Sequence, residues 1–128
     1  MKFSYVPGEL PFVEVTLSSG SQKIVRSALV DSGSTINVLP YEDGLDLGLV
    51  WDEQMVPLKA GGVLSGTPMR AVLLEGKIGS YPPVKLGFAW TQRSCEEIRL
   101  ILGQTNFFQF FDVSFKGKEG TFTILPNK

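Results

Sequence analysis

The sequence predicts an all-β domain of the closed-barrel kind, with at most one or two short helices. Seven or more short segments alternate apolar with polar residues, or stay apolar for a few positions, as β-strands do. Turn-forming residues separate these segments, and helix-like length is found at 105–111. Many short strands joined by turns are typical of β-sandwiches and barrels.

The predicted strands follow one another mostly in hairpins. In chain order they are 12–17, 22–30, 36–39, 55–60, 67–74, 72–78, 84–91, 100–102, 113–115 and 121–125. The first pair is joined by a serine-rich turn and delivers Asp31 at the end of its second strand. Pro40 ends the third strand, and we expect a loop or a single helical turn over 41–49.

Three segments of the second half have distinctive compositions. The glycine-rich segment 61–66 predicts the flexible tip of a hairpin, and the polar segment 92–98 predicts a solvated loop. The segment 105–111 carries a stripe of phenylalanines, which we expect to belong to the core rather than to a binding site.

Composition limits the function classes that fit the chain. A length of 128 residues with 43% apolar residues fits one domain, 1–128, with a real core. The formal net charge of −1 provides no basic field for nucleic acid or an anionic membrane, and no apolar run is long enough to span a bilayer. We therefore expect a soluble, cytoplasmic protein, and the lone Cys95 agrees with a reducing compartment. Because the chain has no histidine, Ser-His and Cys-His nucleophile pairs and the usual zinc ligand sets are excluded, so any hydrolytic chemistry must use carboxylates.

Asp31 is the strongest candidate for chemistry. Apolar residues 28–30 lead into it, and an ionised carboxylate at the end of a buried strand is costly unless donors surround it. Residues 32–35, Ser-Gly-Ser-Thr, supply backbone N–H groups and hydroxyls in a tight turn. Ordinary turn chemistry is the alternative, but apolar strand patterns on both sides favour a functional turn.

The segment 28–40, Ala-Leu-Val-Asp-Ser-Gly-Ser-Thr-Ile-Asn-Val-Leu-Pro, resembles the active-site segment of aspartic proteases, and by size the retropepsin-like ones. Two further segments match in the order of that family, the glycine-rich 59–66 and Leu-Ile-Leu-Gly-Gln at 100–104. The resemblance covers about residues 10–125. It implies a retropepsin-like closed β-barrel with a flap hairpin, and the activity of an aspartic endopeptidase.

The resemblance also implies a catalytic loop of Asp31, Ser32 and Gly33. In the family two such loops meet at a two-fold axis, and their carboxylates share one proton. This chain has a single Asp-Ser-Gly, so the resemblance implies a homodimer in which a water between two Asp31 carboxylates attacks the peptide bond, without metal or cofactor. The resemblance implies that Gly33 lets the partner loop approach and that the Ser32 hydroxyl crosses to it, with bonding within the turn as the alternative for Ser32.

A peptide or protein substrate is the expected partner besides the second copy. The substrate-binding residues that the resemblance implies are Ser34, Ile36, Gly61, Gly62, Val63 and Leu64. The glycines belong to a flap that closes on an extended peptide, and the apolar residues line pockets for its side chains. Ser34 is similar to the residue that hydrogen-bonds the catalytic carboxylate in the pepsin-like branch, and bonding within the turn is the alternative.

Two positions depart from the retroviral pattern. Those enzymes usually have Arg after the glycine of the late segment and an acidic residue four positions after the catalytic Asp, where this chain has Gln104 and Thr35. The ion pair that braces the viral dimer is therefore missing. We expect the interface to use the chain ends instead, with β-prone residues Phe3, Tyr5 and Val6 at the start and 121–125 at the finish as exposed edges that pair across the dimer. Pairing of the ends within one monomer is the alternative.

Two other function classes compete with the protease. A catalytically inactive module of the same fold could bind peptides or serve a structural role, because a fold does not imply a function. A divalent metal site held by carboxylates is less favoured, since the acidic residues are scattered without the spacing of a calcium loop. The intact Asp-Ser-Gly favours catalysis.

Overall fold

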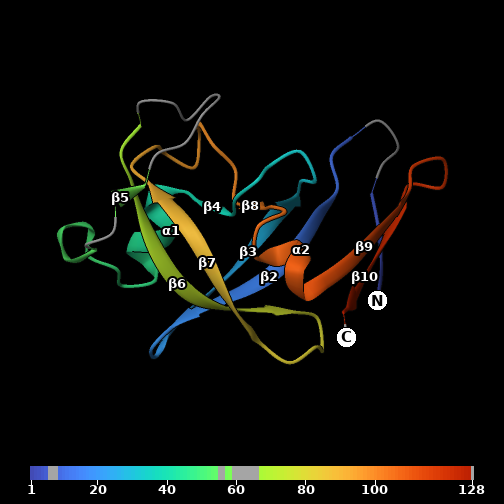
Figure 1. Cartoon of the computed structure of the whole chain (residues 1–128), viewed down its shortest axis with the longest axis horizontal. Coiled ribbons are helices and arrows are strands. Elements are labelled where there is room, and N and C mark those ends of the chain that lie inside the picture. Colours follow the sequence, from blue (N-terminus) through green and yellow to red (C-terminus); the bar gives the residue numbers. More distant parts are fainter. Residues whose placement is uncertain (6–8, 55–56, 59–66, 128) are drawn as a thin grey trace.

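Strands make up most of the structure, a computed structural model that describes residues 1–5, 9–54, 57–58 and 67–127 (Figure 1). The described strands are β1 (Lys2–Ser4), β2 (Phe12–Ser19), β3 (Gln22–Val30), β4 (Val38–Leu39), β5 (Pro57–Leu58), β6 (Met69–Ile78), β7 (Val84–Thr91), β8 (Ile101–Leu102), β9 (Phe111–Lys116) and β10 (Thr121–Pro126). Helical structure in these ranges comprises α1 (Tyr41–Asp46), the 3-10 turn η1 (Trp51–Glu53) and α2 (Phe107–Phe110). The predicted all-β class is confirmed for this part of the chain. No helix within it is long and apolar enough to cross a membrane.

Six of the described strands close into a barrel. The sheet runs in the order β2, β3, β8, β4, β7, β6, and the antiparallel pairing of β6 with β2 closes the barrel. β5 pairs with the start of β6. Because side chains alternate along a strand, one face of each strand points into the barrel, where Leu17, Leu86 and Trp90 are fully buried. The strands predicted over 22–30 and 84–91 are confirmed as β3 and β7.

β8 lies between two strands that are neighbours in the sequence. β3 and β4 flank residues 31–37, yet they do not pair with each other within the described sheet. β8 pairs parallel with β3, with Leu29 opposite Ile101, and antiparallel with β4. The buried strand predicted over 100–102 is thus confirmed in position, and it threads behind the turn that carries Asp31.

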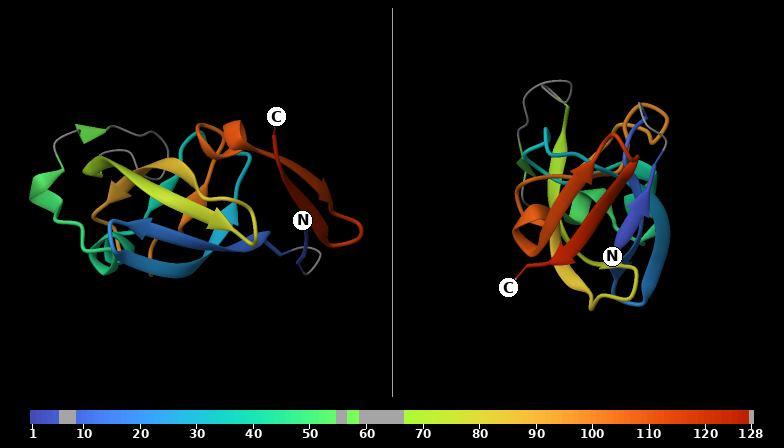
Figure 2. Two further views of the ribbon diagram at one scale, coloured as in Figure 1. Left: turned by 90° about the horizontal axis from the view of Figure 1, so that it is seen from below. Right: turned by 90° about the vertical axis from the view of Figure 1, so that its right-hand side faces the viewer.

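A separate three-stranded sheet contains both ends of the described chain. β10 is its central strand, with β1 on one side and β9 on the other (Figure 2). Phe122 of β10 is fully buried, and its ring stacks on that of Phe3 with centroids 5.4 Å apart. The prediction that 121–125 forms an exposed edge is therefore wrong, because both of its edges are paired within the chain. Among the described strands, β1 and β9 are the edge strands of this sheet.

α2 lies in the segment where helix-like length was predicted, whereas α1 lies in 41–49, where a loop or a single helical turn was expected. α1 is a single short helix in 41–49, and the backbone leaves the helical region at Gly48 with a φ of 78°. α2 begins after Asn106, whose φ is 81°, and contains only part of the predicted 105–111 segment. Of its phenylalanine stripe, Phe107 is fully buried whereas Phe110 is 38% exposed, so the core assignment holds for part of the stripe.

Candidate active site at the Asp31 turn

Asp31 is the first residue after β3, and backbone bonds hold it on both sides. Its N–H donates to the carbonyl of Leu102 at 3.0 Å, and its own carbonyl accepts from the N–H of Ser34 at 3.2 Å. The N–H of Gly33 donates to the carboxylate Oδ1 at 2.8 Å. The side chain is partly exposed, so a buried strand end delivers one carboxylate to the surface with a main-chain donor beneath it.

The hydroxyls of the turn do not surround the carboxylate. The Ser34 hydroxyl donates to the carbonyl of Ile36 at 2.8 Å, so its proton is not available to Asp31. The expected bond from Ser34 to the carboxylate is therefore absent here, and the alternative of bonding within the turn describes this serine. Ser32 is exposed, and its hydroxyl makes no hydrogen bond within the described residues.

The segment after β8 supports the turn from behind. The N–H groups of Gln104 and Thr105 donate to the carbonyls of Ser34 and Thr35, both at 2.8 Å. The side-chain amide of Gln104 also donates to the carbonyl of Ser32. A Cβ at Gly103 would lie 2.4 Å from the carbonyl oxygen of Ile36, closer than atoms approach, so only glycine allows the strand to pass here.

Asn37 is a structural part of the site that the sequence did not single out. It is 2% exposed, and its Oδ1 accepts from the N–H of Gly103 at 2.7 Å. Its Nδ2 donates to the carbonyl of Gly87 at 2.9 Å. Asn37 thus ties the exit of the Asp31 turn to β8 and β7. A signal was present, because an asparagine directly before the apolar Val38–Leu39 strand is a polar group that must be buried with partners.

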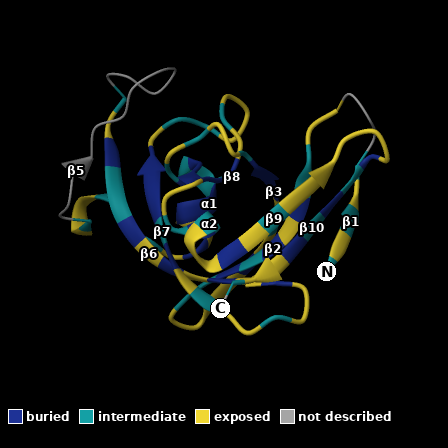
Figure 3. Cartoon of the chain, turned by 45° about the vertical axis from the view of Figure 1, so that its right-hand side comes forward, coloured by how far each residue is buried: buried dark blue, intermediate teal, exposed yellow. Residues whose placement is uncertain are grey.

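Two open cavities flank the exposed Ser32. One, of about 350 Å³, is walled by Asp31 together with apolar residues that include Leu10, Leu29 and Phe115. The other, of about 300 Å³, is lined by Ser32, Phe115 and neighbouring residues of α2 and β9. Leu10 and Phe115 are 45% and 42% exposed. The carboxylate therefore stands at the rim of an apolar surface that continues from the Asp31 turn onto β9. Most residues of β9 are exposed (Figure 3).

The other acidic side chains have other partners or positions. Asp43 and Asp46 on α1 both accept hydrogen bonds from Arg26. Asp112 lies on β9, in the wall of the cavity beyond Ser32. Within the described ranges no hydrogen bond joins Asp31 to a second carboxylate, and no cluster of three or more His, Cys, Asp or Glu side chains could hold a metal ion.

The predicted substrate-binding residues divide into two groups. Ile36 is half-buried and packs against the cluster of Val38, Met69 and Ala89 outside the barrel. Gly61, Gly62, Val63 and Leu64 lie outside the described residues, and so does the predicted flap tip. The strands on either side of that segment are described: Leu58 of β5 lies opposite Met69 of β6.

Comparisons with protein family models and with curated proteins find no match to this chain. Its function is therefore argued from its own residues and their geometry.

Proposed function

We propose that this chain is an aspartic endopeptidase of the retropepsin-like kind, active as a homodimer in which each copy contributes Asp31. The observation that carries the proposal is the arrangement around the Asp-Ser-Gly turn. β8 passes between β3 and β4, and Gly103 packs without a side chain against the back of the turn. The turn is thereby held rigid while its carboxylate faces an open cavity.

The chemistry follows from two carboxylates brought together by two-fold symmetry. Two carboxyl groups at close range cannot both ionise, because their negative charges would repel, so the pair retains one proton. The ionised Asp31 takes a proton from a water that attacks the peptide carbonyl. The protonated Asp31 donates a hydrogen bond to the oxygen on which negative charge develops. No metal and no covalent intermediate is required.

Several features of the single chain fit a second copy at this face. The carboxylate has one backbone donor from its own chain, and the Ser32 hydroxyl beside it is exposed and has no partner in the described residues. The surrounding surface exposes Leu10 and Phe115, and contiguous exposed apolar surface marks interaction sites. The three-stranded sheet offers β9 as a free edge next to this surface.

The interface we propose differs from the one the sequence suggested. Because β10 is paired on both sides, it is not available to the partner. The partner would meet the Asp31 turn, the apolar residues around it and the free edges of β9 and β1. Retroviral enzymes have an Arg at this position, which braces the dimer. Here the side-chain amide of Gln104 instead donates to the carbonyl of Ser32 within its own chain.

The substrate we propose is an extended peptide held across the paired turns. The antiparallel pairing of β5 with β6 is consistent with the hairpin flap that the sequence predicts. Main-chain bonds to strand edges would orient the peptide, and its side chains would alternate between pockets. Of the apolar residues predicted to line such pockets, Ile36 is the one that lies within the described residues.

The experiment that tests the proposal replaces one carboxylate oxygen of Asp31 with an amide nitrogen. Asp31→Asn should lower hydrolysis of a fluorogenic peptide library by about 10²–10⁴-fold, because the pair loses its base. Asp52→Asn, an exposed aspartate on η1, is the matched control and should retain wild-type turnover. A peptide with a hydroxyl group in place of the scissile carbonyl should inhibit wild type, and chelators should not.

The pH dependence provides a second readout. A pair of coupled carboxylates gives a rate that passes through a maximum on the acid side of neutrality. Hydrolysis that survives in Asp31→Asn, or a rate that rises steadily to alkaline pH, would contradict the proposal. Peptide binding without cleavage at any pH would instead favour a catalytically inactive module.

A further inference from the structure

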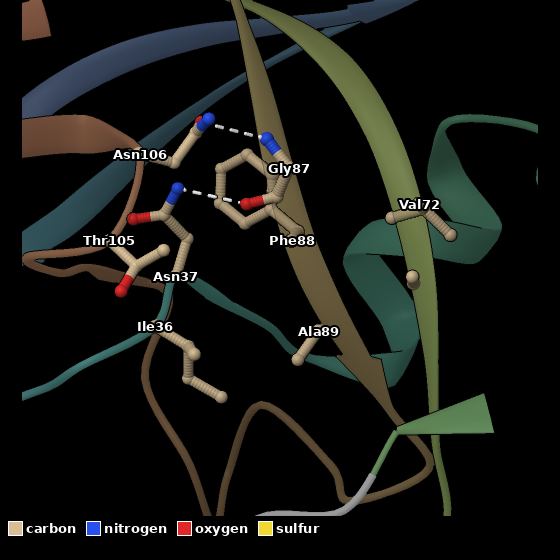
Figure 4. Close-up of a pocket in the computed structure, with 9 residues that line it drawn as sticks. Ile36, Asn37, Val72, Gly87, Phe88, Ala89, Thr105 and Asn106 are labelled. Atoms are coloured by element: carbon tan, nitrogen blue, oxygen red, sulfur yellow. Dashed lines mark hydrogen bonds between the residues drawn. The ribbon is translucent and has the colours of Figure 1, made fainter. Parts of the chain in front are cut away.

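Arg70, the second residue of β6, lies on an aromatic cluster that joins α1 to β7. It follows the alternation that places Leu74 and Ile78 on the buried side of the strand. Ala71 faces the opposite side and lines a pocket of about 240 Å³ together with Gly87. In the view into this pocket, Figure 4 shows α1 behind β6. The Arg70 side chain therefore extends away from that pocket, on the α1 side of the strand.

Two contacts hold the Arg70 guanidinium in place. Its Cζ lies 5.0 Å from the centroid of the Trp51 ring, and its Nη1 donates to the carbonyl of Met69 at 3.3 Å. Trp51 in turn meets Trp90 edge to face, with ring centroids 5.1 Å apart. Trp90 is fully buried, and its Nε1 donates to the carbonyl of Tyr41 at 3.1 Å. The guanidinium is thus held against a ring that is itself anchored in the core.

Arg70 has no acidic partner within the chain. All 13 aspartates and glutamates belong to the described ranges. The ion pairs that they form there are made with Arg26 and Arg93, and none is made with Arg70. Arg70 is nevertheless half-buried, so its positive charge has lost part of its hydration. A partly desolvated charge without a counter-charge is unfavourable, and a bound anion would relieve this cost.

The unused donors of Arg70 form one edge of the guanidinium. Nη1 bonds Met69, whereas Nε and Nη2 donate to no atom in the part of the chain that the structure describes. The N–H groups of Nε and Nη2 are parallel in the planar fork of an arginine, and together they match the two oxygens of one carboxylate. The free edge is therefore the edge that binds a carboxylate with two hydrogen bonds.

The surrounding charges favour an anion with a single charge. Asp52 and Glu53 follow Trp51 on η1 and are exposed, and their charges repel a multiply charged anion such as phosphate. We propose that Arg70 and Trp51 form a binding site, the Arg70 site, for one carboxylate group. The carboxylate is that of a free small acid or of an acidic side chain in a peptide. This site is separate from the Asp31 turn, and its existence does not require the proposed protease activity.

The first test uses the two tryptophans of the chain, Trp51 and Trp90, which both belong to this cluster. Sodium acetate replaces sodium chloride at constant ionic strength and about pH 7, where acetate is ionised and screening is unchanged. Tryptophan emission should change in a saturable way, with a dissociation constant in the millimolar range. The ¹H–¹⁵N signal of Arg70 Nε should shift downfield over the same concentrations, because this N–H gains a charged acceptor.

Three arginine variants separate the site from a general effect of charge. Arg70→Gln should abolish both responses, and Arg70→Lys, which keeps the charge but loses the fork, should weaken binding by about fivefold or more. Arg99→Gln is the matched control, since Arg99 is exposed and lies 5.9 Å from the centroid of another ring, that of Phe12. It removes the same charge and should change the dissociation constant by less than about twofold. Thermal unfolding of each variant verifies that it is folded.

The Arg70 site would be overturned if acetate produced no response in wild type, or the same response in Arg70→Lys as in wild type. The second variant keeps this comparison available even where Arg70→Gln fails to fold. Tighter binding of inorganic phosphate than of acetate would overturn the assignment of a single carboxylate.

Two peptides distinguish the sources of the carboxylate. Acetyl-Ala-Glu-Ala-amide carries one carboxylate, and acetyl-Ala-Gln-Ala-amide is its uncharged match. Binding of the glutamate peptide about tenfold or more tighter than acetate would assign an acidic side chain of a peptide, whereas equal affinity would assign a free small acid. Both results uphold the Arg70 site. Equal binding of the two peptides would overturn it, because the carboxylate would then contribute nothing.

Discussion

Single residues determine how firmly the Asp31 turn is held. Asn37 has three bonds to the backbone of neighbouring segments: to Gly103, to Gly87 and, through its own carbonyl, from the N–H of Ala89 at 2.9 Å. A buried polar group contributes little net stability while it is paired, but its removal leaves its former partners without a hydrogen bond. Of the two backbone groups that face the Asn37 side chain, the N–H of Gly103 is buried and the carbonyl of Gly87 is half-buried.

Asn37→Ala should therefore lower the free energy of unfolding by about 2–4 kcal/mol, because it leaves a buried N–H and a carbonyl unpaired. Asn106→Ala is the matched control, since Asn106 is half-buried and bonds one backbone N–H, and should cost about 0.5–1.5 kcal/mol. Urea denaturation of both variants checks the comparison. Similar losses of unfolding free energy in the two variants would contradict the role of Asn37 in joining the Asp31 turn to β7 and β8.

Two glycines of the same region should respond in opposite ways to an added methyl group. At Gly103 a Cβ would lie 2.4 Å from the Ile36 carbonyl oxygen, so Gly103→Ala should cost about 3 kcal/mol or more, or prevent folding. At Gly87 the space is open, and Gly87→Ala should stabilise the protein by about 0.5–1 kcal/mol by reducing the freedom of the unfolded chain. Thermal melting distinguishes the two, and a stable Gly103→Ala would refute the close threading of β8.

At the scale of elements, α1 is attached to the barrel by a buried carboxylate. Asp43 is 6% exposed, and its Oδ1 accepts from Arg26 Nε of β3 at 3.0 Å. Burial raises the pKa of Asp43 above its ordinary value of 3.8, and the Arg26 guanidinium opposes this rise without cancelling it. The contact between α1 and β3 therefore depends on pH.

Because the pKa of Asp43 is higher in the folded state, the folded protein keeps a proton that the unfolded chain has already released. The contribution of Asp43 to stability is thus fully present below 3.8 and is lost as pH rises through the folded-state pKa. Asp43→Asn should remove this loss, so that its stability relative to wild type increases with pH across that window. Arg26→Met should make the loss larger, since nothing then opposes burial. Urea denaturation between about pH 3.5 and pH 7 measures these slopes, and parallel profiles for wild type and Asp43→Asn would contradict the assignment.

At the scale of the whole molecule, the proposed activity depends on two copies. The apolar surface around Ser32 and the edge strand β9 lie on the same face as the Asp31 carboxylate. One copy alone contains a single Asp31 and therefore no pair of Asp31 carboxylates. The dependence of activity on subunit composition therefore distinguishes a shared site from an independent one.

Wild type and Asp31→Asn, refolded together in equal amounts, should retain about one quarter of the activity of the same total amount of wild type, because only pairs of wild-type chains hold two carboxylates. Independent monomers would retain about one half. Asp52→Asn mixed in the same way should retain full activity. Sedimentation of each mixture should show the dimer, and half activity in a dimeric mixture would exclude the shared site.

Local features of the sequence determined much of the molecule. Alternation of apolar and polar residues identified β3 and β7 to the residue and placed Asp31 directly after a buried strand. Turn residues located the first hairpin, and segment length located α2, whereas the segment that contains α1 was expected to be a loop or a single helical turn. These signals are local because a strand's two faces, a turn's backbone and a helix's length are encoded within a few neighbouring residues.

Only the tertiary structure decided which strands became neighbours and which polar groups met. The period of two along β8 or β10 does not say that β8 enters between β3 and β4, or that β10 lies between β1 and β9. Nor could it show that the Ser34 hydroxyl bonds Ile36, or that Asn37 joins Gly103 to Gly87. The physical reason is that strand pairing uses backbone groups that every residue carries, so the choice of partner depends on how the whole chain buries its apolar faces and satisfies its buried polar groups.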